Sequence, residues 1–581
     1  KSVTVSASNS IGRTLQPISI DIPAGEAREA RWQVLVPYDH TEIQWQIQVI
    51  EEGSDLPSDN MIVAQKIVPA IPVTVLQSTI ARLNTPQNWP VAQAIDALPG
   101  RGGLELKLQS KLGSGLDSVE DFMRSYPYTC FEQRTSVAIA LNDTGRWQTL
   151  MAAAPAFLDA DGLLKYFVSD NLRGSDVLTA YVLKIADEAG WEIDQTLSDL
   201  MLNGLTAFVE GRLDRPMPVG GSSLTYRKLS AINALSRYGK GDAQILDTLE
   251  INAKLLPTSA LLDWIDILEN LSGIANVTAK TDDAYKQLRV RLDLSGTNLR
   301  FSTERDDRLW WLMETIDANA ARTLMTTQEL DDWQDDAPRL TLGLLSRQKY
   351  GRWQTTTANA WGMLAMRKFS AEFEKNPVTG NTEASYGQQS KIINWPEQDN
   401  PPITKLDWVD GTNDLNITHQ GAGTPWVFVT AKAAVPFKQP ISAGYHIKRT
   451  ITAIEQKSHD SWQVGDVMKI HLEITANADM TWVVIDDPVP AGATILGKGL
   501  DTESRRLSQT TRTGNAWPVY TERKFEVYRS YYRYVPKGTF TLEYTIRLNT
   551  VGNYQLPPAR VEAMYAPEIF GAVPIAELVI E

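Results

Sequence analysis

The chain has 581 residues, of which 43% are hydrophobic and 22% are charged, and its formal net charge is −14. This composition is ordinary for a globular protein, and the length predicts three or four domains. The acidic balance argues against a nucleic-acid partner and against simple electrostatic binding to anionic membranes, because both need a basic face. No apolar run is long enough to span a bilayer.

Residues 1–75 are predicted to form β-structure. The run from Glu42 to Val49 alternates between polar and apolar residues, as a half-buried strand does. Pro23 to Glu26 is predicted to be a turn between two apolar runs. The proline-containing stretch from Pro69 to Pro72 is interpreted as a linker that ends this first domain.

The pattern changes to helical near residue 113. Residues 76–112 still contain an alternating strand, from Leu104 to Leu108, but apolar residues between 113 and 372 recur at helical spacing. Ten to twelve helices fit there at usual helix and loop lengths. Their wide apolar faces are compatible with stacked pairs or with a closed α/α toroid, and the periodicity does not choose between them. The clearest sets are Leu178, Tyr181, Val182 and Ile185; Leu261, Trp264, Ile265 and Leu268; and Leu309, Leu312, Met313 and Ile316.

Strands are predicted again after the helices. Residues 373–438 include the apolar run from Trp426 to Val429, and residues 440–581 are interpreted as a β-sandwich. Val467 to Ile474 alternates, and a later strand places one apolar face to the core. The residues of that face are Phe540, Leu542, Tyr544, Ile546 and Leu548.

One octapeptide, from Tyr126 to Gln133, carries the chemistry of the chain. It contains the single cysteine, Cys130, three residues before Gln133. At this spacing the thiol can condense with the glutamine amide, release ammonia and leave an internal thioester, which is a stored electrophile for an amine. A lone cysteine is more often a small buried hydrophobe, and that alternative is a free structural thiol. Pro127 before it and the apolar run after it place Cys130 at or just before a helix N-terminus, which would stabilise a leaving thiolate.

Two motifs resemble one family. Tyr126-Pro-Tyr-Thr-Cys-Phe-Glu-Gln133 is similar to the thioester region of bacterial members of the α2-macroglobulin and complement family, with Thr129 and Phe131 in place of glycine and leucine. Leu556 to Glu568, which contains Met564 and Tyr565, resembles the C-terminal signature of the same bacterial family. The resemblance extends over the whole chain and is densest at 113–370 and 520–575.

The resemblance implies a multidomain α+β fold. Residues 1–75 would be part of an immunoglobulin-like macroglobulin domain, and 113–372 a helical thioester domain with an α/α toroid. That domain would be inserted in a β domain called CUB, split into 76–112 and 373–438, and 440–581 would be a C-terminal macroglobulin-like, receptor-binding-like sandwich. Because the chain starts abruptly at Lys1 with no signal peptide, we expect a C-terminal fragment. The family implies a periplasmic protein tethered to the inner membrane by an N-terminal lipid.

Four further side chains are expected to keep water from the thioester. The family resemblance implies that Tyr126, Tyr128, Met564 and Tyr565 pack over it, and aromatic and methionine side chains exclude water well. Ordinary interface packing is the alternative. Glu132 is interpreted either as an assistant in proton transfer or as a cap of the following helix. No histidine lies between 113 and 372, so we expect direct attack by lysine amines rather than transfer through a histidine.

An acidic, tryptophan-rich stretch offers a competing hypothesis. Paired carboxylates with tryptophans on a helical toroid are typical of some glycoside hydrolases, whereas a solvated acidic surface over core tryptophans is more common. No His/Cys cluster indicates a metal, and no cofactor is expected. The residues concerned are Asp306, Asp307, Asp331, Asp332, Asp335, Asp336, Trp310, Trp311 and Trp333.

The leading functional hypothesis is a protease trap of the bacterial cell envelope. The family implies that a protease cuts a bait segment, the domains rearrange, and a lysine of the protease attacks the thioester carbonyl of Gln133. Such a reaction happens once per molecule, so the chain is not expected to be an enzyme. The alternative is a non-covalent module of the cell envelope, and the family implies a peptidoglycan synthase of the penicillin-binding type as its partner.

Overall fold

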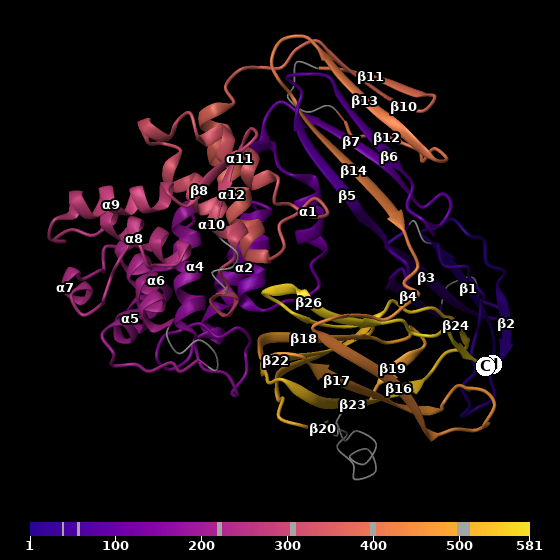
Figure 1. The fold of residues 1–581 in the computed structure, drawn as a ribbon. Coiled ribbons are helices and arrows are strands. Elements are labelled where there is room, and N and C mark those ends of the chain that lie inside the picture. Colours follow the sequence, from indigo (N-terminus) through magenta and orange to yellow (C-terminus); the bar gives the residue numbers. More distant parts are fainter. Residues whose placement is uncertain (38–39, 55–57, 218–222, 303–308, 396–401, 497–511) are drawn as a thin grey trace.

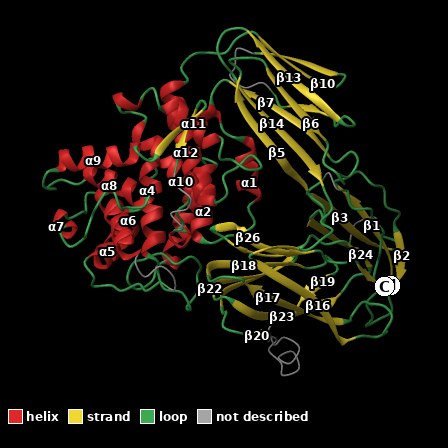
Figure 2. Cartoon of the chain, in the orientation of Figure 1, coloured by secondary structure: helices red, strands yellow, loops and turns green. Residues whose placement is uncertain are grey.

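The computed structural model describes residues 1–37, 40–54, 58–217, 223–302, 309–395, 402–496 and 512–581. Helices and strands are segregated: a helical lobe lies to one side of several β-sheets (Figures 1 and 2). The architecture is therefore mixed helix and sheet, as the sequence predicts. No helix in the described ranges is long and apolar enough to cross a membrane.

The N-terminal sheet is antiparallel, with the order β2-β1-β3-β4. The predicted strand is confirmed in β3, and the predicted turn is closed by a hydrogen bond from the Glu26 N–H to the Pro23 carbonyl at 3.1 Å. Ile43 is the one hydrophobic side chain that is fully buried in the described part of residues 1–72, so this sheet has little core of its own. Its strands are β1 (Ser2–Asn9), β2 (Ile18–Asp21), β3 (Glu42–Glu51) and β4 (Asp59–Lys66).

Two four-stranded sheets combine strands that precede the helical lobe in the sequence with strands that follow it. Their orders are β11-β10-β13-β6 and β12-β7-β14-β5, and β14 pairs with both β5 and β7. The predicted domain boundary at residue 75 falls within β5, which begins at Val73. The strands are β5 (Val73–Arg82), β6 (Gln87–Ala92), β7 (Gly102–Gln109), β10 (Asn381–Tyr386), β11 (Gln389–Asn394), β12 (Thr404–Leu406), β13 (Thr412–Gln420) and β14 (Trp426–Ala434).

The helical lobe has twelve α-helices in its described residues, within the predicted number. Its larger helices are α1 (Asp117–Ser125), α2 (Phe131–Ala140), α3 (Thr144–Ala153), α4 (Asp176–Glu188), α5 (Gln195–Val209), α6 (Leu224–Arg237), α8 (Thr258–Asn270), α9 (Val277–Arg289), α10 (Ile316–Thr327), α11 (Ala337–Leu345) and α12 (Thr356–Phe373). The short elements are α7 (Ala243–Leu246), η1 (Leu112–Ser114), η2 (Ala154–Phe157), η4 (Trp310–Leu312), η5 (Asp331–Trp333), β8 (Leu292–Ser295) and β9 (Asn298–Phe301).

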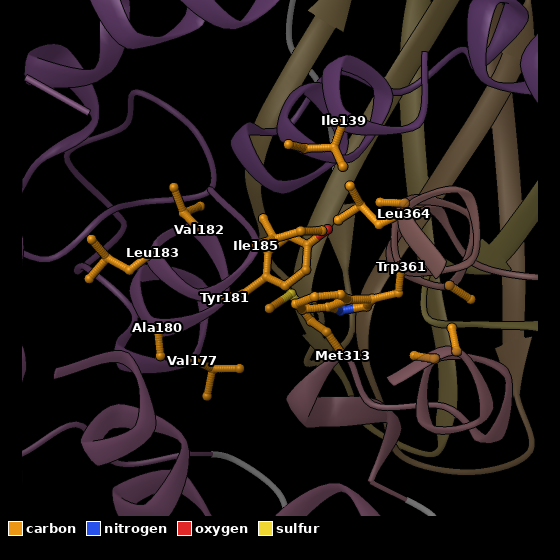
Figure 3. Close-up of a cluster of buried hydrophobic side chains, with 14 of the residues drawn as sticks. Ile139, Val177, Ala180, Tyr181, Val182, Leu183, Ile185, Met313, Trp361 and Leu364 are labelled. Carbon is orange, nitrogen blue, oxygen red and sulfur yellow. The ribbon is translucent and has the colours of Figure 1, made fainter. Parts of the chain in front are cut away.

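The even-numbered helices α2, α4, α6, α8, α10 and α12 contact one another in succession, and α12 returns to α2, which closes a ring. Apolar side chains fill the part of this ring beside α2. Figure 3 shows Tyr181 of α4 facing Trp361 of α12, with Met313 close by. The two rings of Tyr181 and Trp361 meet edge to face with centroids 6.3 Å apart. Both α4 and α12 contact α2, the helix that begins with the last three residues of the octapeptide.

The C-terminal sandwich packs a six-stranded sheet, β15-β26-β25-β18-β22-β21, against a five-stranded sheet, β16-β17-β23-β19 with β20 on β23. The predicted apolar face of β23 is confirmed, since all five of its residues are buried. The strands are β15 (Ile441–Ala443), β16 (Tyr445–Glu455), β17 (Val467–Ala476), β18 (Met480–Pro488), β19 (Ala493–Ile495), β20 (Arg512–Thr513), β21 (Pro518–Arg523), β22 (Val527–Val535), β23 (Gly538–Leu548), β24 (Gly552–Tyr554), β25 (Ala559–Ala563), β26 (Ala566–Val573) and β27 (Leu578–Ile580).

Candidate functional site: a buried Cys–Gln pair between two lobes

Cys130 is the N-cap residue of α2, as the sequence predicts. Gln133 occupies the third helical position, and its side chain turns back: the Cys130 N–H donates to Gln133 Oε1 at 3.2 Å. The Cys130 sulfur in turn accepts the backbone N–H of Gln133, which completes a reciprocal capping box. Both side chains are fully buried. The cap therefore holds Cys130 and Gln133 against each other within one helical turn.

Burial controls the ionisation of Cys130. Burial raises the pKa of the thiol well above its usual value, and the negative charge of Glu132 raises it further. The backbone N–H groups of Gln133 and Glu132 lower the pKa, as expected at a helix N-terminus, but burial outweighs them. The predicted stabilisation by backbone N–H groups is therefore present, but in this closed arrangement burial outweighs it for the free thiol. The prediction for the thiolate that leaves during amine attack stays a prediction.

Glu132 does not act as a hydrogen-bonding cap, because the capping box belongs to Cys130 and Gln133. Its fully buried carboxylate accepts three hydroxyl hydrogen bonds: Oε1 from Ser136 at 2.6 Å and Thr356 at 2.9 Å, and Oε2 from Tyr565 at 2.8 Å. Burial raises the pKa of Glu132, and these three donors oppose the rise. The interpretation of Glu132 as a cap is thus replaced by that of a buried carboxylate that joins three elements.

Tyr565 and Met564 lie in the turn between β25 and β26, and both are buried against the helical lobe. The Tyr565 hydroxyl reaches Glu132, while the Met564 N–H donates to the Trp482 carbonyl at 2.8 Å. The turn is therefore held on both sides of the interface. The structure brings these two residues to the Cys–Gln pair, although they lie more than 400 positions away in the chain.

Tyr126 and Tyr128 cover the pair from the segment before α2. The Gln133 amide donates to the Tyr126 hydroxyl at 3.4 Å, and the two tyrosine rings meet edge to face at 5.5 Å. Tyr128 also meets Tyr531 of β22 edge to face, at 6.2 Å. Tyr126 and Tyr565 therefore contact the site directly, whereas Tyr128 and Met564 are buried in the same core cluster as Cys130. Their packing excludes water, whatever further role they have.

Several other residues of the site belong to no motif that could be recognised in the sequence. Arg529 of β22 donates to the Pro127 carbonyl at 2.9 Å and to Asp486 at 2.7 Å. The Tyr166 carbonyl accepts the Phe131 N–H at 2.8 Å, and its ring packs on Trp482 with centroids 3.9 Å apart. These contacts join segments that are distant in the chain, and no local motif marks their members.

The acidic stretch forms a surface rather than a catalytic pair. Arg289 binds Asp336 at 3.0 Å and Asp332 at 3.4 Å, and its guanidinium lies 3.9 Å from the centre of the buried Trp333 ring. The Asp332 side chain is 76% exposed. Asp306 and Asp307 lie outside the described residues. The described carboxylates thus fit a solvated face over a core tryptophan, and within the described ranges no group of His, Cys, Asp and Glu could hold a metal ion.

Comparisons with known proteins agree with the expected resemblance. Residues 444–568 match the family model described as the bacterial alpha-2-macroglobulin MG10 domain. An alpha-2-macroglobulin homolog of Nostoc sp. is 25% identical over 291 residues, which cover 46% of this chain and 15% of that protein. Alpha-2-macroglobulin of Escherichia coli K12 is 22% identical over 286 residues, 46% of this chain and 16% of that protein. The matches thus span less than a fifth of these relatives' length.

Two solved structures share the fold over the whole chain. Native alpha-2-macroglobulin from Escherichia coli, spanning domain MG7 to the C-terminus, has a TM-score of 0.72 at 18% identity and is covered to 94%. Salmonella alpha-2-macroglobulin reacted with methylamine has a TM-score of 0.70 at 18% identity and is covered to 39%. The chain therefore resembles the C-terminal region of bacterial alpha-2-macroglobulins, as the two motifs predict.

Proposed function

We propose that this chain, which resembles the C-terminal region of bacterial alpha-2-macroglobulins, is the covalent-capture part of a protease trap. The observation that carries the proposal is the buried Cys130–Gln133 capping box, closed by Tyr565 from the C-terminal sandwich. In this assignment the ring of helices is an α/α toroid, and the sheets that flank it in sequence form a split CUB-like domain. The single sheet of residues 1–72 is part of a macroglobulin-like sandwich, and residues 440–581 are a complete one.

The proposed chemistry has two steps. The Cys130 thiol attacks the side-chain carbonyl carbon of Gln133, and ammonia leaves as the thioester forms. An amine then attacks the same carbon, an amide bond forms, the carbon–sulfur bond breaks, and Cys130 takes the proton released by the amine. Only one turnover follows, so the chain acts as an inhibitor rather than as an enzyme. The relative reacted with methylamine supports an amine as the attacking group.

The target is proposed to be a protease that attacks the cell envelope, captured through lysine amines after cleavage of a bait segment. A periplasmic location with a lipid anchor at the inner membrane accords with that target, since a reactive thioester would be consumed by cytosolic amines. No observation in the described structure favours the alternative, a docking module for a peptidoglycan synthase.

The intact mass of the chain tests the proposal. A mass short by one ammonia, a blocked thiol, and thiol release with uptake of methylamine would establish the thioester. The Cys130→Ala variant is the control and should take up no methylamine. A full mass with a free, unreactive thiol in freshly purified protein would overturn the covalent mechanism.

Glu132 is proposed to relay the proton from the attacking amine to sulfur. Glu132→Gln is expected to slow methylamine uptake by about 10²–10⁴-fold, the usual contribution of a general base, because the amide keeps the size of the side chain but cannot accept that proton. The rate of methylamine uptake against pH is the measurement. Ser136→Ala removes one donor to the same carboxylate and is the matched control, with a much smaller effect. Equal rates in wild type and Glu132→Gln would exclude the relay.

A further inference from the structure

A cavity lies between the helical lobe and the C-terminal sandwich and is lined by residues of both. Its volume is about 240 Å³, about eight times the share of one water molecule in the liquid. The helical lobe contributes Arg173, Arg215, Arg227 and Trp311, and the sandwich contributes Trp482 and Arg533. Tyr166, which packs on Trp482, also lines it. The cavity is therefore lined by Tyr166 and Trp482, whose rings pack on each other across the contact between the two lobes.

Two of the four arginines are neutralised by carboxylates. Arg227 makes a bidentate pair with Asp176, through Nε at 2.9 Å and Nη2 at 2.7 Å. Arg215 Nη2 binds Asp159 at 2.7 Å and Asp161 at 2.6 Å. These two arginines face three carboxylates, so both are fully neutralised and one negative charge is left over on this wall. They neutralise only Arg215 and Arg227, which both belong to the helical lobe.

The other two arginines have no carboxylate partner among the described residues. Arg533 donates to the Pro216 carbonyl at 3.2 Å, a neutral acceptor, and Arg173 is exposed. Burial lowers the pKa of Arg533, and the positive charges of Arg227 and Arg173 act in the same direction, whereas Tyr166 and the carboxylate of Asp176 oppose the shift. In addition, the indole N–H of Trp311 is buried without a hydrogen-bond partner in the described part of the chain. One partly buried guanidinium with a neutral acceptor and one buried indole N–H with none thus line the same cavity, together with the exposed Arg173. A buried donor without a partner is uncommon in a folded protein.

We propose that this cavity binds a phosphate-type oxyanion. A phosphate is an anion whose oxygens accept the planar paired donors that arginine presents, and Arg173 and Arg533 are the two guanidinium groups of the lining without a carboxylate pair in the described residues. Arg173 belongs to the helical lobe and Arg533 to β22 of the sandwich. A bound oxyanion would therefore connect the two lobes electrostatically across their contact.

The consequence for reactivity rests on the proposed function. Because the anion favours the closed contact, its presence should slow the opening that admits an amine to Cys130 and Gln133. Anion binding itself does not depend on the thioester, so the two ideas can fail separately.

Isothermal titration calorimetry of the whole chain with inorganic phosphate tests the site. Saturable binding is expected, and Arg533→Gln or Arg173→Gln should weaken it about tenfold or more, with partial recovery in Arg533→Lys. Arg547→Gln, on the exposed face of β23, is the charge-matched control and should bind like wild type. Absence of saturable binding, or equal weakening in Arg547→Gln, would overturn the proposal.

Two further experiments identify the source of the anion and its effect on methylamine uptake. Tighter binding of glycerol phosphate than of inorganic phosphate would indicate a phosphorylated organic molecule, whereas equal binding would indicate the free ion. Phosphate should also slow methylamine uptake by wild type but not by Arg173→Gln. If phosphate binds and methylamine is never taken up, the anion site stands and the covalent trap fails.

Discussion

Replacing Tyr565 with alanine is expected to open the Cys130–Gln133 pair to reagents. The side chain is buried at the interface, and its hydroxyl holds Glu132 at 2.8 Å. Removing a buried aromatic side chain costs about 3–5 kcal/mol. If only a third of that loss falls on the contact between the lobes, the open population rises about tenfold. The rate of methylamine uptake, or of Cys130 alkylation if the thiol is free, should rise by at least that factor.

Two variants control for other causes of this rise. Tyr565→Phe keeps the ring and removes one hydrogen bond, so its effect should be smaller, since a neutral hydrogen bond contributes about 0.5–1.5 kcal/mol. Tyr534→Ala removes a tyrosine from β22 whose hydroxyl binds Asp479, away from the Cys–Gln pair, and should leave the rate unchanged. A Tyr565→Ala protein with the wild-type rate would show that this residue does not shield the site.

Replacing Asp263 with alanine is expected to give the largest loss of stability in the helical lobe. Its fully buried carboxylate accepts from Lys184 Nζ, Arg322 Nη2 and Asn233 Nδ2, each at 2.8 Å. The variant would leave two buried cations short of a partner, which costs about 3–5 kcal/mol. Urea denaturation followed by far-UV circular dichroism, which reports the helices, measures the loss. Asp335→Ala, at an exposed position, should be close to neutral.

The contribution of Asp263 to the free energy of unfolding is expected to depend on pH. Burial alone would raise the pKa of Asp263, but Lys184 and Arg322 outweigh it and lower the pKa from 3.8 to about 2. A group whose pKa is lower in the folded state stabilises the fold above its unfolded pKa and loses this contribution as the pH falls. The difference in unfolding free energy between wild type and Asp263→Ala should therefore narrow between pH 4 and pH 2. A difference that stayed constant over that range would contradict the assignment.

Local patterns predicted the parts of the fold that local physics determines. The alternation in β3 and β17 and the helical spacing in α4 gave the right elements, because one buried face imposes the period of each. The position of Cys130 before α2 followed from Pro127 and from the apolar residues after Gln133. The Cys–Gln geometry is itself local, since it is a reciprocal cap within one helical turn.

The rest depends on contacts between distant segments. The role of Glu132 could not be read from the octapeptide, because Thr356 and Tyr565 reach it from α12 and from the C-terminal sandwich. The raised pKa of Cys130 could not be predicted either, because the helix terminus is visible in the sequence but its complete burial is not. The cavity between the lobes gave no sequence signal, since its arginines come from separate elements.

The strand pairing around β14 has a consequence for how the chain is made. β5, β6 and β7 leave the ribosome before the helices, yet their partners β13 and β14 come after them; Asn88 and Asn416, 328 positions apart, are bonded at 2.6 Å. Such non-local pairing slows folding, because a long loop must close first. We expect collapse of the helical lobe to shorten that loop and to precede completion of the sheets. In that order of events the early strands would expose unpaired edges, which are prone to aggregation.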